Sequence, residues 1–138
     1  MSPLAIAVLT ISDSRTPDND TSGDLLVERL TGNGHLLASR ALIPDNVYQI
    51  RATVSNWVAD DTTDVVLTTG GTGFTGRDST PEALLPLFDK TIEGFGELFR
   101  QISYEEIGSS TIQSRAVAGL SNATLIFAVP GSTNACAT

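Results

Sequence analysis

Short apolar runs alternate with amphipathic stretches along most of this chain. The runs at residues 4–11, 35–43 and 64–69 predict β-strands, and the first run is apolar enough to be covered on both faces. Between them lie two stretches with apolar side chains at helical spacing. The first, residues 21–34, has Leu25, Leu26 and Leu30 on one stripe and either Asp20 or Thr21 as its cap. The second runs from Asp45 or Asn46 through Val58. Strands that alternate with helices in this way are typical of a parallel sheet between two helical layers.

Helix-start and turn signals extend this pattern to the end of the chain. A short helix is expected to start at Thr80-Pro81, a longer one covers residues 93–107, and a hairpin turns at Ser121-Asn122. The sequence therefore predicts an α/β fold of three layers, α/β/α. Its sheet is mostly parallel and doubly wound, and the C-terminal hairpin adds one antiparallel strand.

The length and charge narrow the class of protein. A chain of 138 residues fits a single domain, 1–138, and no apolar run approaches the ~20 residues of a membrane span. The net charge of −8 disfavours nucleic acid and acidic membranes as partners. The lone cysteine, Cys136, excludes an internal disulfide and leads us to expect a cytoplasmic protein. A doubly wound fold needs a helix over its last strand, so we expect a C-terminal helix missing after Thr138.

The segment GTGFTG at residues 71–76 matches the dinucleotide pattern G-x-G-x-x-G, but its context does not fit that function. The third glycine of that pattern packs in the first turn of a helix, whereas here the helix cannot begin before Pro81. The segment also follows the third strand instead of the first. We therefore reject a nicotinamide or flavin site, and no Walker A lysine is present.

What the glycine segment offers is a place for an anion at the carboxyl end of a central strand. Two further loops have the same position, Asp45 after the second strand and Gly131-Ser132 after the last one. These residues also have simpler interpretations. Asp45 could be a helix N-cap, Asp78 could be a helix N-cap or a surface acid, and the glycines could form tight turns.

Parallel strands end at the same edge of a sheet, so these loops can converge. They would bring together Ser12 and Asp13, Asp45, the glycine segment with Asp78, and Gly131-Ser132. Two carboxylates with hydroxyl and amide donors suit a phosphorylated ligand with Mg²⁺. A nucleophilic triad is not available, because the single histidine, His35, begins the second strand and is expected at the surface.

Seven segments together resemble the MoaB/Mog family of molybdenum cofactor biosynthesis proteins, and the MoaB branch most closely. They are ISD at 11–13, LIPD at 42–45, TTGGTG at 68–73, RDSTPEAL at 77–84, EGFGE at 93–97, QSRAVAG at 113–119 and TLIFAVPGS at 124–132. The resemblance covers nearly the whole chain.

The resemblance implies an Mg²⁺- and ATP-dependent molybdopterin adenylyltransferase that assembles as a homotrimer or homohexamer. It assigns Asp45 and Asp78 to catalysis and to the metal. For the pterin and its phosphate it implies Ser12, Thr69, Gly70, Gly71, Thr72, Gly73, Ser114, Arg115, Gly131 and Ser132. A scaffold that binds molybdopterin without catalysis is the alternative, since the MoaB branch contains such members, typically where the two acids are replaced.

Overall fold

The computed structural model describes residues 3–70, 80–92 and 117–129 of the chain. Its six-stranded sheet has the order β2-β1-β3-β6-β5-β4. The strands are β1 (Ala5–Ile11), β2 (Leu36–Ile43), β3 (Val65–Thr69), β4 (Lys90–Thr91), β5 (Val117–Ser121) and β6 (Thr124–Val129). The helices are α1 (Thr21–Gly32), α2 (Val47–Ala59) and α3 (Thr80–Leu84), with 3-10 turns η1 (Pro17–Asn19) and η2 (Leu85–Leu87).

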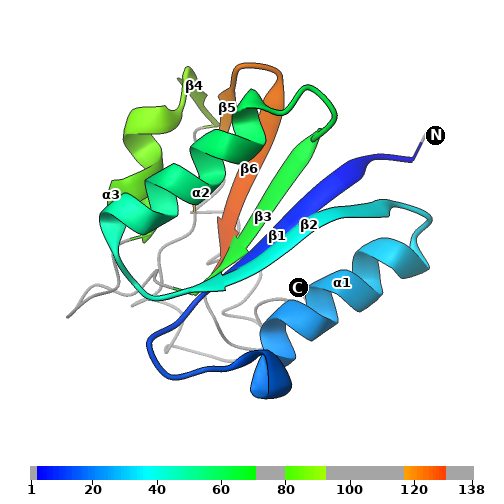
Figure 1. Cartoon of the computed structure of the whole chain (residues 1–138). Helices are drawn as coiled ribbons and strands as arrows, with labels where there is room; N and C mark the ends of the chain where they lie inside the picture. The colour runs from blue at the N-terminus through cyan, green and yellow to red at the C-terminus, as the bar shows by residue number, and fades with distance from the viewer. Residues whose placement is uncertain (1–2, 71–79, 93–116, 130–138) are drawn as a thin grey trace, which may run out of the picture.

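Strand direction decides where the strands end. β1 pairs in parallel with both β2 and β3, and β3 pairs in parallel with β6. These four strands therefore end at one edge of the sheet, which is the lower edge in Figure 1. β5 runs antiparallel to both β6 and β4 and is the one reversed strand among the described elements. The predicted fold class is confirmed.

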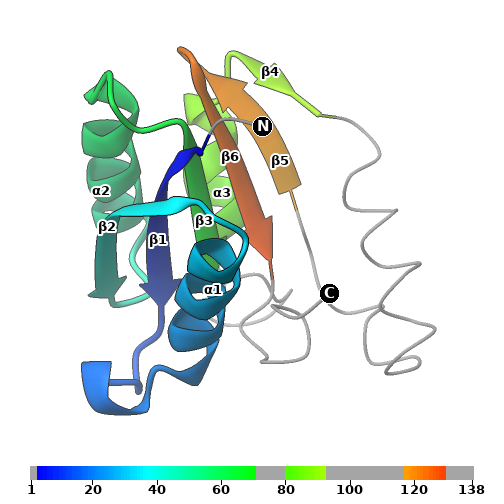
Figure 2. The ribbon, with the colours of Figure 1, turned by 90° about the vertical axis from the view of Figure 1, so that its right-hand side faces the viewer.

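The helices cover the two faces of the sheet separately. α1 lies on one face, and α2 and α3 lie on the other (Figures 1 and 2). β1 alternates its side chains between these faces. Ala7, Leu9 and Ile11 pack with α2 and α3, whereas Ile6 and Val8 pack with α1.

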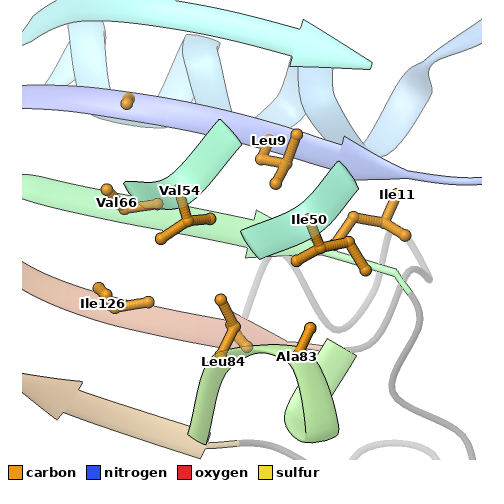
Figure 3. Close-up of a cluster of buried hydrophobic side chains, with 10 residues drawn as sticks. Leu9, Ile11, Ile50, Val54, Val66, Ala83, Leu84 and Ile126 are labelled. Atoms are coloured by element: carbon orange, nitrogen blue, oxygen red, sulfur yellow. The ribbon is translucent and has the colours of Figure 1, made fainter. Parts of the chain in front are cut away.

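The larger core lies on the α2/α3 face (Figure 3). Ile50 and Val54 of α2 meet Leu84 of α3 above Val66 and Ile126, and all five side chains are fully buried. The predicted apolar stripe of α2 is confirmed, because Val47 and Val58 also pack against this core.

The α1 stripe differs slightly from the prediction. Leu26 and Leu30 are buried and Val27 packs beside them, but Leu25 is only half-buried and does not join the core. The cap is Asp20, whose carboxylate accepts a hydrogen bond from the Gly23 N–H at 3.1 Å. Asp20 was one of the two residues expected to cap this helix.

The C-terminal half agrees with the prediction where the structure describes it. The hairpin turns through Asn122, which has a φ of 55° in the left-handed region, and joins β5 to β6. β4 was not predicted, because two residues are too few to show an alternating pattern. The predicted helix at 93–107 and the segment after Val129 lie outside the described residues. Among the helices that are described, none has both the length and the hydropathy to cross a membrane.

Candidate functional site

A small polar pocket of about 100 Å³ lies between the carboxyl ends of β1 and β3. It is lined by Thr10, Ile11, Ser12, Arg15, Ser22, Thr69 and Gly70. Three residues of the predicted set, Ser12, Thr69 and Gly70, are therefore brought together from two strands. The pocket also includes Arg15 and Ser22, which sequence analysis did not single out.

Gly70, directly after β3, has a backbone conformation that requires glycine. Its φ is 98°, and a Cβ atom at this position would collide with the carbonyl oxygen of Ile11. Its own carbonyl accepts a hydrogen bond of 2.9 Å from Thr80 Oγ1. The start of α3 is thus tied to the end of β3, and the ends of β1 and β3 lie in close contact.

Ser12 shapes the loop that follows β1. Its N–H donates to the carbonyl of Ile43 at 2.9 Å, which holds the ends of β1 and β2 together. Its Oγ accepts hydrogen bonds from the N–H groups of Ser14 and Arg15, at 3.2 and 3.1 Å. This turn sets the position of the Arg15 backbone at the pocket.

Behind the pocket lies a buried carboxylate, Asp20, which is 1% exposed. It accepts hydrogen bonds from Thr10 Oγ1 at 2.7 Å and from the Arg40 guanidinium at 3.1 Å, besides the Gly23 N–H that it caps. Arg40 also contacts Asp24 at 2.7 Å. Asp24 and then Asp20 raise the pKa of Arg40 against the opposing effect of burial.

Arg15 lies on the pocket side of this network. Its Nη1 donates to Thr21 Oγ1 at 3.0 Å and to Ser22 Oγ at 3.3 Å, and it lies 4.0 Å from Asp20 Oδ1. From the sequence alone, Asp20 is expected only to cap a helix. No local pattern reveals that a β2 arginine and a loop arginine meet the same carboxylate.

Asp45 lies where the sequence placed it, two residues beyond the end of β2, and it is 7% exposed. Its N–H donates to Asp13 Oδ1 at 3.1 Å, so acids from the β1 and β2 loops adjoin each other. The N-cap of α2 is Asn46, whose side chain accepts from the N–H groups of Tyr48 and Gln49. The helix-cap alternative for Asp45 is therefore wrong.

The second predicted acid, Asp78, lies outside the described residues. So do seven of the predicted binding residues: Gly71, Thr72, Gly73, Ser114, Arg115, Gly131 and Ser132. Within the described ranges no group of three or more histidine, cysteine or acidic residues is arranged to hold a metal. The predicted metal site thus stays a prediction, with Asp45 as its described member.

His35 is half-buried, so it is less exposed than expected. Its Nδ1 accepts a hydrogen bond of 3.1 Å from the N–H of Leu4, and its side chain lines a cavity of about 460 Å³ beside Leu26 and Leu67. Leu4 and His35 immediately precede β1 and β2, so this histidine lies at the edge opposite the small pocket, as the sequence indicated.

With this geometry in place, the similarity to known proteins identifies the class. The family described as "Probable molybdopterin binding domain" matches residues 7–138. Molybdenum cofactor biosynthesis protein B of Escherichia coli K12 is 57% identical over 136 residues, covering 99% of this chain and 80% of that protein. The Bacillus subtilis protein of the same name is 45% identical, covering 93% and 76%.

Solved structures agree with the sequence relatives. A crystal structure of molybdenum cofactor biosynthesis protein B superposes with a TM-score of 0.95 at 45% identity, covering 99% of this chain and 85% of that one. The tungsten cofactor synthesizing protein MoaB from Pyrococcus furiosus gives 0.88 at 36% identity, covering 99% and 88%. The chain belongs to the molybdopterin-binding family of molybdenum cofactor biosynthesis proteins. Within that family the relatives named above are MoaB proteins.

Proposed function

We propose that this chain is a molybdopterin adenylyltransferase that works in molybdenum cofactor biosynthesis. In the proposed reaction a terminal phosphate oxygen of molybdopterin attacks the α-phosphorus of ATP. A new P–O bond forms, the bond from the α-phosphorus to the bridging oxygen breaks, and pyrophosphate leaves. The products are adenylylated molybdopterin and pyrophosphate.

The observation that carries the proposal is Asp45, which is buried at the edge of the sheet beside Asp13. A carboxylate is costly to bury, and this one does not serve as the cap of the next helix, since Asn46 does. Its hard oxygen atoms suit Mg²⁺. We assign Asp45 and Asp78 as the residues that would hold this ion, which supplies charge neutralisation at phosphate oxygens when bound.

In this reaction the side chains and backbone of the protein would serve to position the pterin phosphate and the triphosphate of ATP. Ser12, Thr69 and Gly70 line the described pocket. In the proposal they act together with Gly71, Thr72, Gly73, Ser114, Arg115, Gly131 and Ser132 to hold the pterin and its phosphate. Asp45 and Asp78 would hold the triphosphate so that the α-phosphorus faces the pterin phosphate.

The decisive experiment mixes the purified protein with Mg·ATP and molybdopterin and looks for adenylylated pterin by mass. We expect the product, and we expect Asp78→Asn to lower its rate of formation about 100-fold or more, because a metal ligand is lost. Molybdopterin binding by the same variant should change far less. Asp61→Asn removes one charge at an exposed turn and serves as the matched control.

Two outcomes would contradict this assignment. An Asp78→Asn variant with full turnover would show that Asp78 does not hold the ion. A wild-type protein that binds molybdopterin but forms no adenylylated product would instead be the non-catalytic scaffold.

We further propose that the protein acts in the cytoplasm as a homotrimer or homohexamer. Sedimentation velocity separates these two assemblies from each other and from a monomer of 14.5 kDa. A monomer at micromolar concentration would contradict this part of the proposal.

A further inference from the structure

The small pocket at the ends of β1 and β3 contains a positive charge in a chain whose net charge is −8. The charge belongs to Arg15, whose side chain is 30% exposed and lines the pocket. An arginine held at a polar cavity gives that cavity a charge opposite in sign to the net charge of the chain. This makes the pocket a candidate for a bound anion.

The contacts of Arg15 leave most of its guanidinium available. The guanidinium makes three contacts, with Thr21, Ser22 and Asp20, and all three use Nη1. Within the described part of the chain, Nε and Nη2 therefore have no protein partner. A guanidinium presents its donors in a planar fork that matches the oxygen atoms of a phosphate.

Asp20 does not cancel this charge. It lies 4.0 Å from Arg15, whereas Arg40 contacts its other oxygen at 3.1 Å. Asp20 is also satisfied by the Thr10 hydroxyl and the Gly23 N–H. The buried carboxylate is thus compensated mainly from the β2 side, and it fixes the wall behind the pocket without a close ion pair to Arg15.

Hydroxyl groups complete the lining. Ser12 Oγ accepts two backbone hydrogen bonds, which leaves its own hydrogen either for Ser14 Oγ at 3.4 Å or for a ligand in the pocket. Gly70 brings the β3 backbone close without a Cβ atom. A volume of about 100 Å³ equals roughly three water molecules. That space suits one phosphate group and is too small for a pterin or an adenine ring.

We infer that Arg15 binds a phosphate group of the ligand in this pocket, together with the hydroxyl of Ser12. The inference deepens the proposed function and rests on it for the identity of the ligand. The phosphate can come from either of two sources, the phosphate monoester of molybdopterin or the phosphate chain of ATP. Both offer the same chemistry to the pocket.

The test measures the dissociation constants of the protein for three probes, molybdopterin, dephosphorylated molybdopterin and ATP. Arg15→Gln should weaken binding of the phosphate-bearing probe about 10- to 100-fold, which is the effect of losing a charge-assisted hydrogen bond. Arg15→Lys should retain part of this affinity, because lysine keeps the positive charge but lacks the planar pair of donors of a guanidinium. Arg29→Gln, at the far end of α1, removes the same charge and should leave all three constants unchanged.

The pattern across the probes identifies the source. A loss confined to molybdopterin, with the dephosphorylated pterin unaffected, assigns the pocket to the pterin phosphate, and a loss confined to ATP assigns it to the nucleotide. Equal losses for molybdopterin and its dephosphorylated form, or no loss for either phosphate-bearing probe, would overturn the inference. A thermal unfolding curve of Arg15→Gln that overlays the wild type shows that the fold is intact.

Failure of the inference can be told apart from failure of the proposed function. A wild type that binds molybdopterin but transfers no AMP contradicts only the enzyme assignment, and the Arg15 comparison can still be made. A wild type that transfers AMP at a rate and affinity matched by Arg15→Gln contradicts only the inference. A wild type that binds neither molybdopterin nor ATP contradicts both.

Discussion

The buried threonines of the sheet differ in what their hydroxyl groups contact. Thr124 Oγ1 donates to the carbonyl of Thr63 at 3.2 Å, and Thr10 Oγ1 donates to Asp20. Thr68, which is fully buried in β3, has a hydroxyl without a partner among the described residues. A buried polar group in this state costs about 1–3 kcal/mol of folding free energy.

Replacing Thr68 with valine should therefore stabilise the protein. The two side chains have similar shape, so we expect the free energy of unfolding to rise by about 1 kcal/mol. The measurement is urea denaturation followed by circular dichroism. Thr124→Val is the matched control, and it should lower the free energy of unfolding because it leaves the Thr63 carbonyl without its donor. A Thr68→Val variant as destabilised as Thr124→Val would show that the Thr68 hydroxyl has a structural partner.

Residue type alone does not determine which of two adjacent residues, Asp45 or Asn46, caps helix α2. Asp45 and Asn46 are equally good N-cap residues, and the sequence left both open. The structure selects Asn46, since its side chain accepts from two N–H groups in the first turn of α2. This choice depends on where the chain leaves β2, which is a tertiary property that no local pattern contains.

At the scale of the element, α1 contains two glycines in very different surroundings. A Cβ atom at Gly23 would collide with the Asp20 carboxylate and with Thr10 Oγ1. At Gly32, the last residue of the helix, a Cβ atom would meet nothing within 4 Å. The first glycine allows the helix to approach β1, and the second costs helix stability without any contact in return.

Alanine substitutions at Gly23 and Gly32 should change the free energy of unfolding in opposite directions. Gly32→Ala should raise the free energy of unfolding by about 0.5 kcal/mol, because alanine loses less backbone entropy on folding. Gly23→Ala should lower it by about 1–3 kcal/mol, because Asp20 must move. Thermal or urea unfolding measures both. Equal effects of the two variants would contradict the close packing of Gly23 against Asp20.

Periodicity was sufficient for the long elements and insufficient for the short ones. The apolar stripes of α1 and α2 and the runs of β1 and β3 have enough residues to show their spacing. β4 consists of Lys90 and Thr91 alone, and its place is determined by pairing with Gly119 and Leu120. An element of that size owes its structure to a partner strand distant in sequence.

At the scale of the molecule, the buried network around Asp20 joins β1, α1 and β2. The sequence predicted that polar loops meet at one edge of the sheet, and Ser12, Thr69 and Gly70 do so. It did not reveal Arg15 or Arg40, because each reads as an ordinary surface arginine in its own segment. Only the parallel order of β2, β1 and β3 brings these charges together.

This network predicts unequal roles for the two acids that contact Arg40. Arg40→Ala should lower the free energy of unfolding by about 1–3 kcal/mol, since Asp20 is buried and loses its closest cation. Asp24→Ala should cost less than about 1 kcal/mol, because the Asp24 side chain is 58% exposed. Urea denaturation compares the two, and a larger effect from Asp24→Ala would refute the central place of Asp20.

The hydrogen bond from Thr80 to the Gly70 carbonyl has a consequence for ligand affinity. It holds the end of β3 and the start of α3 together, so the entropy of bringing these two elements together is lost when the protein folds, before any ligand binds. A ligand bound at this edge of the sheet would meet two elements that are already held in position, so none of its interaction energy would be needed to bring them together. The Thr80 hydroxyl would thus favour ligand binding by holding β3 and α3 in place, without contacting the ligand itself.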